Sequence, residues 1–193
     1  MDLIHTLKNR RSTGVGYLTD PAPSDAELNE LLTPAMSAPD HGAIRPWRFK
    51  IIRGESRHHL GRLFEKARRV DKPDATEDEL ETLRQKPLRA PLVIAICAEI
   101  REGHPKVPPV EQIIAAGCAT QNILLAIHAS PYAGVLLTGW MAHHDLVKEG
   151  LGLASKDVII GFLHLGSQKE EPRIKKRADV ATYLERWPAP TGG

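Results

Sequence analysis

The stretch VEQIIAAGCATQNILLAIHA, residues 110–129, decides the fold of this chain. It belongs to a longer run, residues 112–144, that contains no Asp, Glu, Lys or Arg. Polar residues at 120–122 interrupt the run, and its apolar parts are shorter than the roughly 20 residues that a bilayer requires. We therefore predict a buried helix over 110–129, followed by a buried strand in the apolar run 133–141, and no membrane span.

On both sides of this helix, apolar runs of strand length alternate with segments whose apolar residues recur at helical spacing. The run PLVIAICA, residues 91–98, is continuously apolar, which is typical of a strand that is buried on both faces. Further strands are predicted at 47–53 and 158–165. Helices are predicted near 3–9, 24–35, 60–67 and 145–151, the second of them opening with the capping box Ser24–Glu27. About four strands alternating with helices indicate an α/β or α+β layered domain.

The segment 68–85 is the most polar part of the chain and contains a second capping box, Thr76–Glu79. We interpret it as a surface excursion or a lid. The charged stretch 168–193 is interpreted as a C-terminal tail of the same single domain, which spans 1–193. Within it, the basic run 173–177 is interpreted as a solvated charge cluster balanced by nearby glutamates.

Composition narrows the functional classes. The 193 residues include 26 Lys and Arg and 24 Asp and Glu. These charges nearly cancel, which removes any global electrostatic argument for a nucleic-acid partner. The two cysteines are too few for a disulfide framework, so a reduced, cytoplasmic setting is predicted. The pairs His58–His59 and His143–His144 lack the three- or four-residue spacing that zinc pairs use on a helix, so no metal site is predicted.

Two short motifs carry candidate chemistry. Arg10, Arg11 and Ser12 follow the first helix, and their guanidinium and hydroxyl donors can hold a phosphate. The alternative is a pair of cations that only interact with the helix dipole. His41 lies on a loop between Pro39 and Gly42, where it is either a ligand-binding residue or a residue that ties the loop together; Asp40 either orients its ring or caps the turn.

Taken in order, these pieces resemble the nitroreductase family of flavoproteins, and its small YdjA-like branch most of all. The resemblance rests on Asn9-Arg10-Arg11-Ser12, Ala38-Pro-Asp-His41, Pro46-Trp47, Ala90-Pro-Leu-Val-Ile, Lys106-Val-Pro, Glu111-Gln, Ala116-Gly-Cys118, Ile160-Gly-Phe-Leu163 and Leu165-Gly166. It covers about residues 1–168. It implies an α+β fold with a central, mostly antiparallel sheet flanked by helices, and an intertwined homodimer with two FMN sites at its interface. Helix 110–129 would then be the spine of the dimer.

The resemblance also implies roles for residues. Arg10, Arg11 and Ser12 would hold the FMN phosphate and ribityl chain, and Ser37 and His41 would approach the flavin from the partner subunit. Leu136, Leu137 and Thr138 would contact the isoalloxazine ring through their backbone. The stretch Ala126, Ile127, His128, Ala129, Ser130 and Pro131 corresponds to one assigned to the nicotinamide nucleotide.

The implied activity is an FMN-dependent NAD(P)H oxidoreductase that works by ping-pong hydride transfer through flavin N5. Its acceptor would be a small molecule such as a nitroaromatic or a quinone; the physiological acceptor and the choice between NADH and NADPH stay open. Two departures from the family pattern motivate an alternative, namely a protein that sequesters flavin without significant turnover. Relatives often carry an arginine shortly after the Arg-Arg-Ser triplet and another before the later glycine, where this chain has Val15 and Leu137. Lys106 is a cation that could substitute for them.

Overall fold

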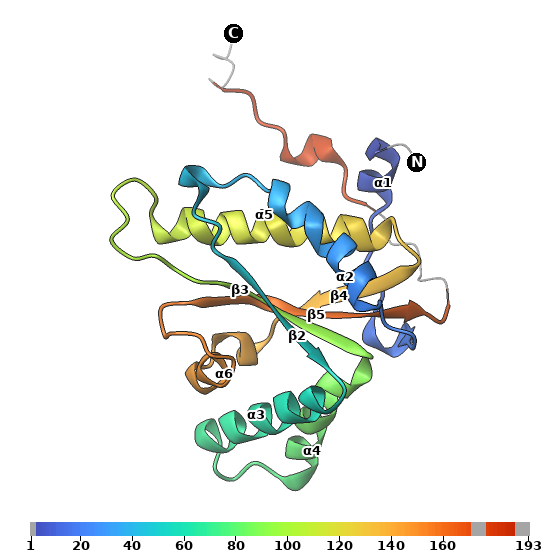
Figure 1. Cartoon of the computed structure of the whole chain (residues 1–193), viewed down its shortest axis with the longest axis vertical. Coiled ribbons are helices and arrows are strands. Elements are labelled where there is room, and N and C mark those ends of the chain that lie inside the picture. The colour runs from blue at the N-terminus through green and yellow to red at the C-terminus, as the bar shows by residue number, and fades with distance from the viewer. Residues whose placement is uncertain (1–2, 171–176, 188–193) are drawn as a thin grey trace.

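The computed structural model describes residues 3–170 and 177–187, and these form one sheet covered by helices on both faces (Figure 1). The strands are β1 (Leu18–Thr19), β2 (Trp47–Arg53), β3 (Leu92–Ala98), β4 (Tyr132–Leu137) and β5 (Val158–Gln168). β5 pairs with β3 and with β4, β2 pairs with β3, and β1 pairs with the end of β5. Every one of these pairings is antiparallel, which confirms the α+β class over α/β.

The pleat of β3 explains why the sheet is covered twice. All seven of its residues are buried. Leu92, Ile94 and Ile96 join an apolar cluster with α2 (Asp25–Leu32) and α5 (Pro109–His128). The residues between them, Val93, Ala95 and Cys97, join a second cluster with α3 (Glu55–Asp71), α4 (Glu77–Gln85) and α6 (Asp145–Gly150). A continuously apolar strand thus supplies the core on both faces, as its sequence predicted.

Segment 68–85 is neither a separate excursion nor a lid. It completes α3, turns, and returns as α4, whose Leu80 and Leu83 are buried against α3. The capping box at Thr76 is formed as predicted. The two helices approach closely at Gly61, where a Cβ would lie 2.3 Å from the carbonyl oxygen of Arg84. Only glycine permits this contact, so the segment is a packed helical hairpin.

Strand boundaries differ from the prediction near the two ends of the β4–β5 pair. β4 ends at Leu137 rather than 141, because Gly139 takes a φ of +85° and turns the chain into a 3₁₀ turn, Trp140–His143. β5 runs on to Gln168, because Gly166 and Ser167 pair with the start of β4. The two-residue β1 was not predicted. α1 (Leu3–Asn9) lies where its spacing placed it.

α5 lies across one face of the sheet but is only partly covered by its own chain (Figure 1). By length and composition alone it could cross a membrane, and 39% of its apolar window is buried. Ala116, Ala119 and Ile123 face the core, whereas Val110 and Ile114 are each 58% exposed. An exposed apolar row on a helix of this kind is typical of an interface between chains.

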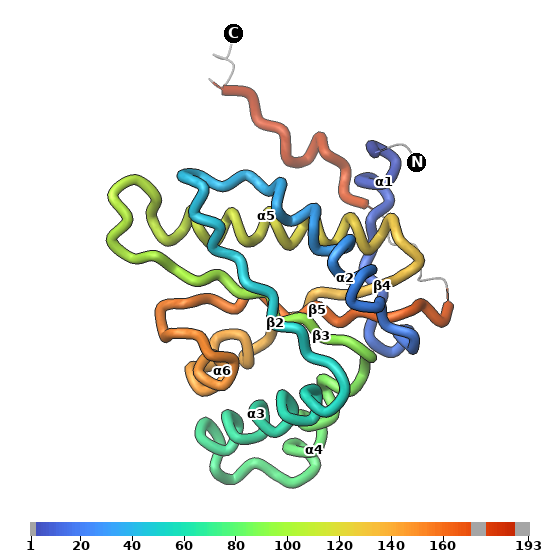
Figure 2. The backbone as a smooth tube through the Cα atoms, in the orientation of Figure 1, coloured from blue at the N-terminus to red at the C-terminus, as the bar shows by residue number. Residues whose placement is uncertain are grey.

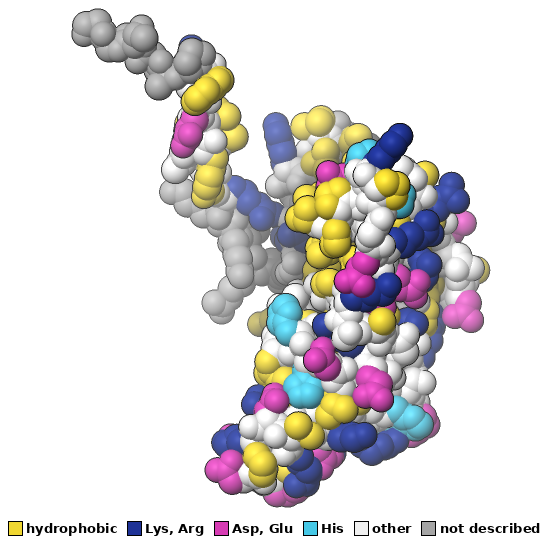
Figure 3. Space-filling view, turned by 90° about the vertical axis from the view of Figure 1, so that its left-hand side faces the viewer, with side chains coloured by type: hydrophobic (Ala, Val, Ile, Leu, Met, Phe, Trp, Pro, Cys, Tyr) yellow, Lys and Arg dark blue, Asp and Glu magenta, His cyan; other side chains and the backbone are white. Residues whose placement is uncertain are grey.

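The C-terminal segment leaves the body next to α1 (Figure 2). There the guanidinium of Arg177 donates to the carbonyl oxygen of Arg10. Beyond this contact Val180, Tyr183 and Leu184 are largely exposed, and Trp187 is 96% exposed. Figure 3 shows this segment standing away from the body with hydrophobic side chains on it. The described part of the tail is therefore apolar as well as charged.

Candidate functional site

Arg10, Arg11 and Ser12 lie in the loop between α1 and a 3₁₀ turn, Val15–Tyr17. The next residue, Thr13, fixes this loop to the sheet: its backbone N–H donates to Gly134 O of β4 at 3.0 Å. Its hydroxyl donates to Gln168 Oε1 at the end of β5, also at 3.0 Å. Arg10 Nη1 lies 3.3 Å from Ser12 Oγ. The three predicted phosphate donors thus gather at one end of the β4–β5 pair.

One more cation and an imidazole ring approach this loop. Arg177 reaches it from the C-terminal segment, and His128 from the end of α5. Partial burial, and then the charge of Arg177, lowers the pKa of Arg10. The pKa of His128 is lowered by burial and then by Arg11, Arg10 and Arg177. Like charges gathered in this way favour an anion between them.

Arg177 is a site residue that sequence reasoning missed. It was assigned to a solvated cluster, most of which lies outside the described residues. No local pattern could have found it, because 167 positions separate it from Arg10.

The stretch predicted for the nicotinamide nucleotide adjoins the same cluster. His128, Ser130 and Pro131 line a cavity of about 250 Å³ together with Arg11 and Thr13. The same stretch also makes structural contacts. Ile127 is buried in the core, and Ser130 Oγ donates to Ile127 O at 2.8 Å while accepting from Tyr132 N at 3.1 Å. Ala126 packs against the core, and Ala129 is the C-cap of α5.

Ser37 and His41 both contact α5, His41 at its first turn and Ser37 beyond its middle. His41 Nδ1 lies 2.6 Å from Glu111 Oε2. Ser37 Oγ donates to Pro34 O at 2.8 Å, and Asn122 of α5 contacts both residues. Asp40 caps the turn by accepting from Arg45 N at 2.6 Å. Of the two roles considered for Asp40 the structure shows the cap, and Glu111 contacts the His41 ring.

One chain does not bring His41 and the Arg10 loop together. His41 contacts Glu111 in the first turn of α5, whereas His128 at its last turn faces Arg10 and Arg11. At 1.5 Å per residue, about 25 Å of helix separates the two places.

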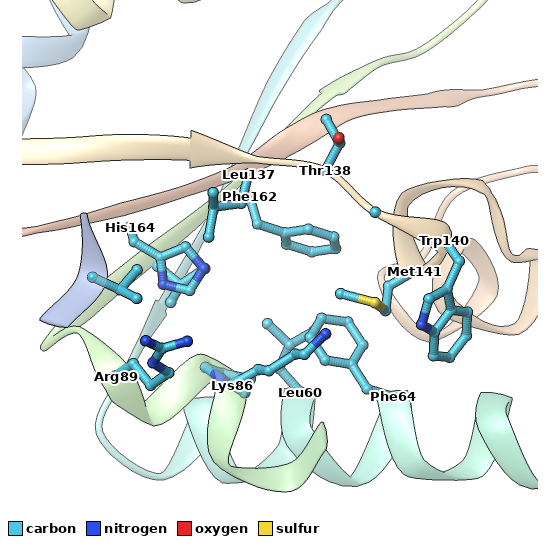
Figure 4. Close-up of a pocket in the computed structure, with 14 residues that line it drawn as sticks. Leu60, Phe64, Lys86, Arg89, Leu137, Thr138, Trp140, Met141, Phe162 and His164 are labelled. Carbon is cyan, nitrogen blue, oxygen red and sulfur yellow. The ribbon is translucent and has the colours of Figure 1, made fainter. Parts of the chain in front are cut away.

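The predicted ring contacts, Leu136, Leu137 and Thr138, lie at the exposed end of β4 and lead into Gly139. A cavity of about 320 Å³ opens beside Leu137 and Thr138, on the α3 side of the sheet (Figure 4). Its walls are mostly apolar: Val15, Leu60, Phe64, Pro87, Val93, Trp140, Met141 and Phe162. Val15 and Leu137, the two positions at which the resemblance led us to expect an arginine, thus line the same cavity.

The cations of this cavity are Lys86 and Arg89, from the 3₁₀ turn that precedes β3, and His164 lines it from β5. Burial, then the charges of Arg68 and Arg89, lowers the pKa of Lys86. Lys106, named above as a cation that could substitute for those arginines, does not line this cavity: its loop precedes α5 and packs beside Gly42, near His41. Sequence reasoning named neither Lys86 nor His164, because nothing local marks them.

His164 gives stability a pH dependence. Burial, and then the charge of Arg89, lowers its pKa to about 4. The folded state therefore binds fewer protons than the unfolded state between pH 6.5 and 4, so stability falls as pH falls through that window. The loss approaches about 3 kcal/mol below pH 4. Urea unfolding of the wild type at pH 7, 5.5 and 4.5, compared with His164→Phe, measures it. Equal pH slopes for the two proteins would contradict this role.

Metal ligation finds no support in the parts of the chain at 3–170 and 177–187, where no group of three or more His, Cys, Asp or Glu could hold an ion. His144 instead caps α6 by accepting from Leu146 N at 3.1 Å, and its Nε2 lies 3.3 Å from Asp71.

Comparisons with known proteins decide the family. The sequence model of the Nitroreductase family matches residues 7–167, which is most of the chain. The chain belongs to the nitroreductase family. This confirms the resemblance stated above.

Among curated relatives of this nitroreductase-family chain, a protein of Escherichia coli strain K12 named "Putative NAD(P)H nitroreductase YdjA" is 34% identical over 180 residues, 93% of each chain. A "Putative NAD(P)H nitroreductase" of Haemophilus influenzae is 34% identical over 188 residues, 95% of this chain and 100% of its own. A solved nitroreductase-like protein of Bacillus cereus superposes with a TM-score of 0.83 at 26% identity, covering 98% and 97% of the two chains. A Desulfovibrio desulfuricans structure, described as a putative nitroreductase in complex with FMN, has a TM-score of 0.71 at 24% identity over 97% of each chain.

Proposed function

We propose that this nitroreductase-family member is an FMN-dependent oxidoreductase that takes electrons from NADH or NADPH and passes them to a small-molecule acceptor. The observation that carries the proposal is the pairing of a cationic cluster with a mostly apolar cavity along one strand. Thr13 fixes the Arg10–Ser12 loop beside β4, and β4 leads from there to the cavity at Leu137. The names of the relatives support the same cofactor and electron donor.

The residues fit FMN at both of its ends. Arg10, Arg11 and Arg177 offer planar guanidinium donors to a phosphate, and Ser12 offers a hydroxyl. Aromatic and aliphatic walls such as Phe64, Phe162 and Leu137 suit a planar ring. Bound FMN would supply the hydride chemistry that links the reduced nicotinamide to the acceptor.

The protein groups then have binding and orienting roles. Leu136, Leu137 and Thr138 hold the ring through their backbone, and the buried walls exclude water from one of its faces. The cationic Lys86 and Arg89 favour negative charge near the cavity. His128, Ser130 and Pro131 receive the nicotinamide nucleotide. No side chain of this chain is assigned as a catalytic acid or base.

The flavin site is completed by a second copy of the chain. His41 lies about 25 Å along α5 from the Arg10 loop, so a single chain does not offer both to one flavin. A two-fold axis across the middle of α5 would place the partner copy's start of α5 against this chain's end. The homodimer would then bury the exposed apolar residues Val110 and Ile114 against the partner copy.

The cytoplasmic setting remains a prediction that follows from the cysteines. Both are free: Cys118 is half-buried, and burial raises the pKa of Cys97 to about 12, so its thiol is inert. The absence of nucleic-acid and membrane partners likewise stays a prediction.

Steady-state kinetics test the ping-pong order. With FMN-loaded protein, double-reciprocal plots against the reduced nicotinamide should be parallel at several fixed concentrations of a quinone or a nitroaromatic, because the two substrates use one site in turn. Intersecting lines would show a ternary complex and contradict the order. The same plots made with NADH and with NADPH measure the preference between the two donors.

A further inference from the structure

A second cavity lies at the end of the sheet where β2 begins, β3 ends and β5 begins. It has a volume of about 240 Å³. The strand register brings these three ends together, since Ala98 pairs with Trp47 on one side and with Val158 on the other. Each of the three chain segments supplies basic side chains to the wall of this cavity: Arg45, Arg48, Arg101 and Lys156. The proposed function so far gives the cavity no role.

The two carboxylates in the wall already have partners. Asp157 is buried and accepts from Ile100 N and Ala154 N, both at 2.8 Å, so it holds two of the segments together. Glu99 forms an ion pair with Arg48 at 2.9 Å. Within residues 3–170 and 177–187, the remaining basic side chains of the cavity have no hydrogen-bond or ion-pair partner: Arg45, Arg101 and Lys156. The cavity therefore carries an excess of positive charge.

The backbone that carries Arg45 is held in an unfavourable conformation. Arg45 has a φ of +51°, in a region that residues other than glycine seldom adopt. Its N–H donates to Asp40 Oδ2 at 2.6 Å, and its carbonyl oxygen accepts from Arg48 Nη1 at 3.0 Å. Strain of this kind persists only where surrounding contacts impose it, and it is concentrated at binding sites. The contacts of Asp40 and Arg48 thus fix the origin of the Arg45 side chain beside the cavity.

A phosphate group is the ligand that fits this wall. Guanidinium groups offer phosphate oxygens a fork of N–H donors, and a lysine ammonium adds a point charge. The apolar residues that line the cavity are Ile44, Pro46 and Ile100, and none of them is aromatic. The cavity therefore suits a phosphate and not the ring of a nucleotide.

The cavity adjoins the start of α5. Arg101 N donates to Gln112 Oε1 at 2.9 Å, and Gln112 Nε2, in the first turn of α5, donates to Arg101 O at 3.0 Å. Figure 1 shows the loop between β3 and α5 at one end of this helix and α1 at the other. The proposed homodimer places the start of α5 of one copy against its end in the other. The cavity of one copy then lies beside the 126–131 stretch of the other.

We propose that Arg45, Arg101 and Lys156 bind the 2′-phosphate of NADPH when the nucleotide lies at the 126–131 stretch of the other copy. NADH carries a hydroxyl in place of this phosphate and gains nothing from the three cations. The three residues therefore make NADPH the preferred electron donor. This inference rests on the proposed function and names the donor that the function leaves open.

The test compares two ligands that differ only in this phosphate. Adenosine 2′,5′-bisphosphate and 5′-AMP are titrated calorimetrically into the FMN-loaded protein. Wild type should bind the bisphosphate at least tenfold more tightly than 5′-AMP, because charge-assisted contacts to its 2′-phosphate are added. Arg101→Ala combined with Lys156→Ala should bring this ratio close to one. Arg101→Lys keeps the charge and should retain most of the ratio. Arg62→Ala, an exposed arginine on α3, should behave as wild type.

Turnover gives a second readout. The ratio of kcat/KM for NADPH to kcat/KM for NADH should fall about tenfold in the combined variant, through KM for NADPH. A purely structural role for Arg101 and Lys156 would instead weaken both donors equally and leave this ratio unchanged.

The outcomes separate this inference from the proposed function. Equal ligand ratios in wild type and in the combined variant would overturn the inference and leave the oxidoreductase proposal intact. Inorganic phosphate whose binding depends on Arg101, with no such dependence for the bisphosphate, would assign the cavity to a free anion and also overturn it. FMN-loaded protein that oxidises neither NADH nor NADPH would overturn the proposed function, whereas the calorimetric ratio needs no turnover. Circular dichroism checks the fold of each variant.

Discussion

A folded monomer without bound FMN is the expected result of replacing Ile114 by arginine. Ile114 is 58% exposed and lies outside the core clusters, so the charge leaves the single chain folded. In the homodimer it would be buried in an apolar contact, where an unpaired charge costs several kcal/mol. Losing the dimer also removes the partner copy's Ser37 and His41 from the flavin. Light scattering behind a sizing column, with absorbance at the flavin bands, reports mass and loading together.

Val70→Arg is the matched control for this variant. Val70 is 61% exposed near the end of α3, on the opposite face of the sheet from α5, so the same change there should leave a flavin-loaded dimer. A monomer of Ile114→Arg that retains FMN with wild-type affinity would refute the shared site. A loaded dimer of Ile114→Arg would move the interface away from this row of α5.

The second large effect is expected at Arg10. Arg10→Ala should weaken FMN binding by about 1.5–3 kcal/mol, or roughly 10- to 150-fold, because it removes a charge-assisted contact to the phosphate. The loss should be greatest at low salt, because the attraction between Arg10 and the phosphate is screened least there. Isothermal titration of the apoprotein with FMN gives the affinity.

Riboflavin, which lacks the phosphate, is the ligand control for Arg10→Ala. Its affinity should be the same in wild type and in the variant, and Arg62→Ala, an exposed arginine on α3, should bind both ligands as wild type does. If Arg10→Ala bound FMN as tightly as wild type, Arg10 would return to its alternative role at the dipole of α1.

Patterns local in the sequence predicted most of the fold. β3 is apolar at every position, and two capping boxes mark the starts of α2 and α4. The features of the fold that were not predicted depend on contacts between residues distant in the sequence. β1 has only two residues and no pattern of its own. The end of β5 is held by pairing with β4, and the hairpin of α3 and α4 depends on the contact at Gly61.

The candidate site was predictable only where its residues are adjacent in the chain. Arg10, Arg11 and Ser12 form a motif, and the resemblance carried their role with it. Arg177, Lys86 and His164 come from three separate segments and meet other site residues only in the folded chain. Arginine, lysine and histidine are common residue types, so neither composition nor spacing identifies these three as site residues. Glu111 was noted for the resemblance alone, and its contact with His41 is long-range as well.

The central claim, a flavin that this protein reduces with a nicotinamide nucleotide, is tested most directly by anaerobic stopped-flow absorbance. FMN-loaded protein is mixed with NADH or with NADPH in the absence of any acceptor. The account predicts that at least one of them bleaches the flavin bands in a single fast phase, and that a quinone or a nitroaromatic then restores them. A protein that binds FMN but shows negligible bleaching with either nucleotide would contradict the account and establish the sequestering alternative.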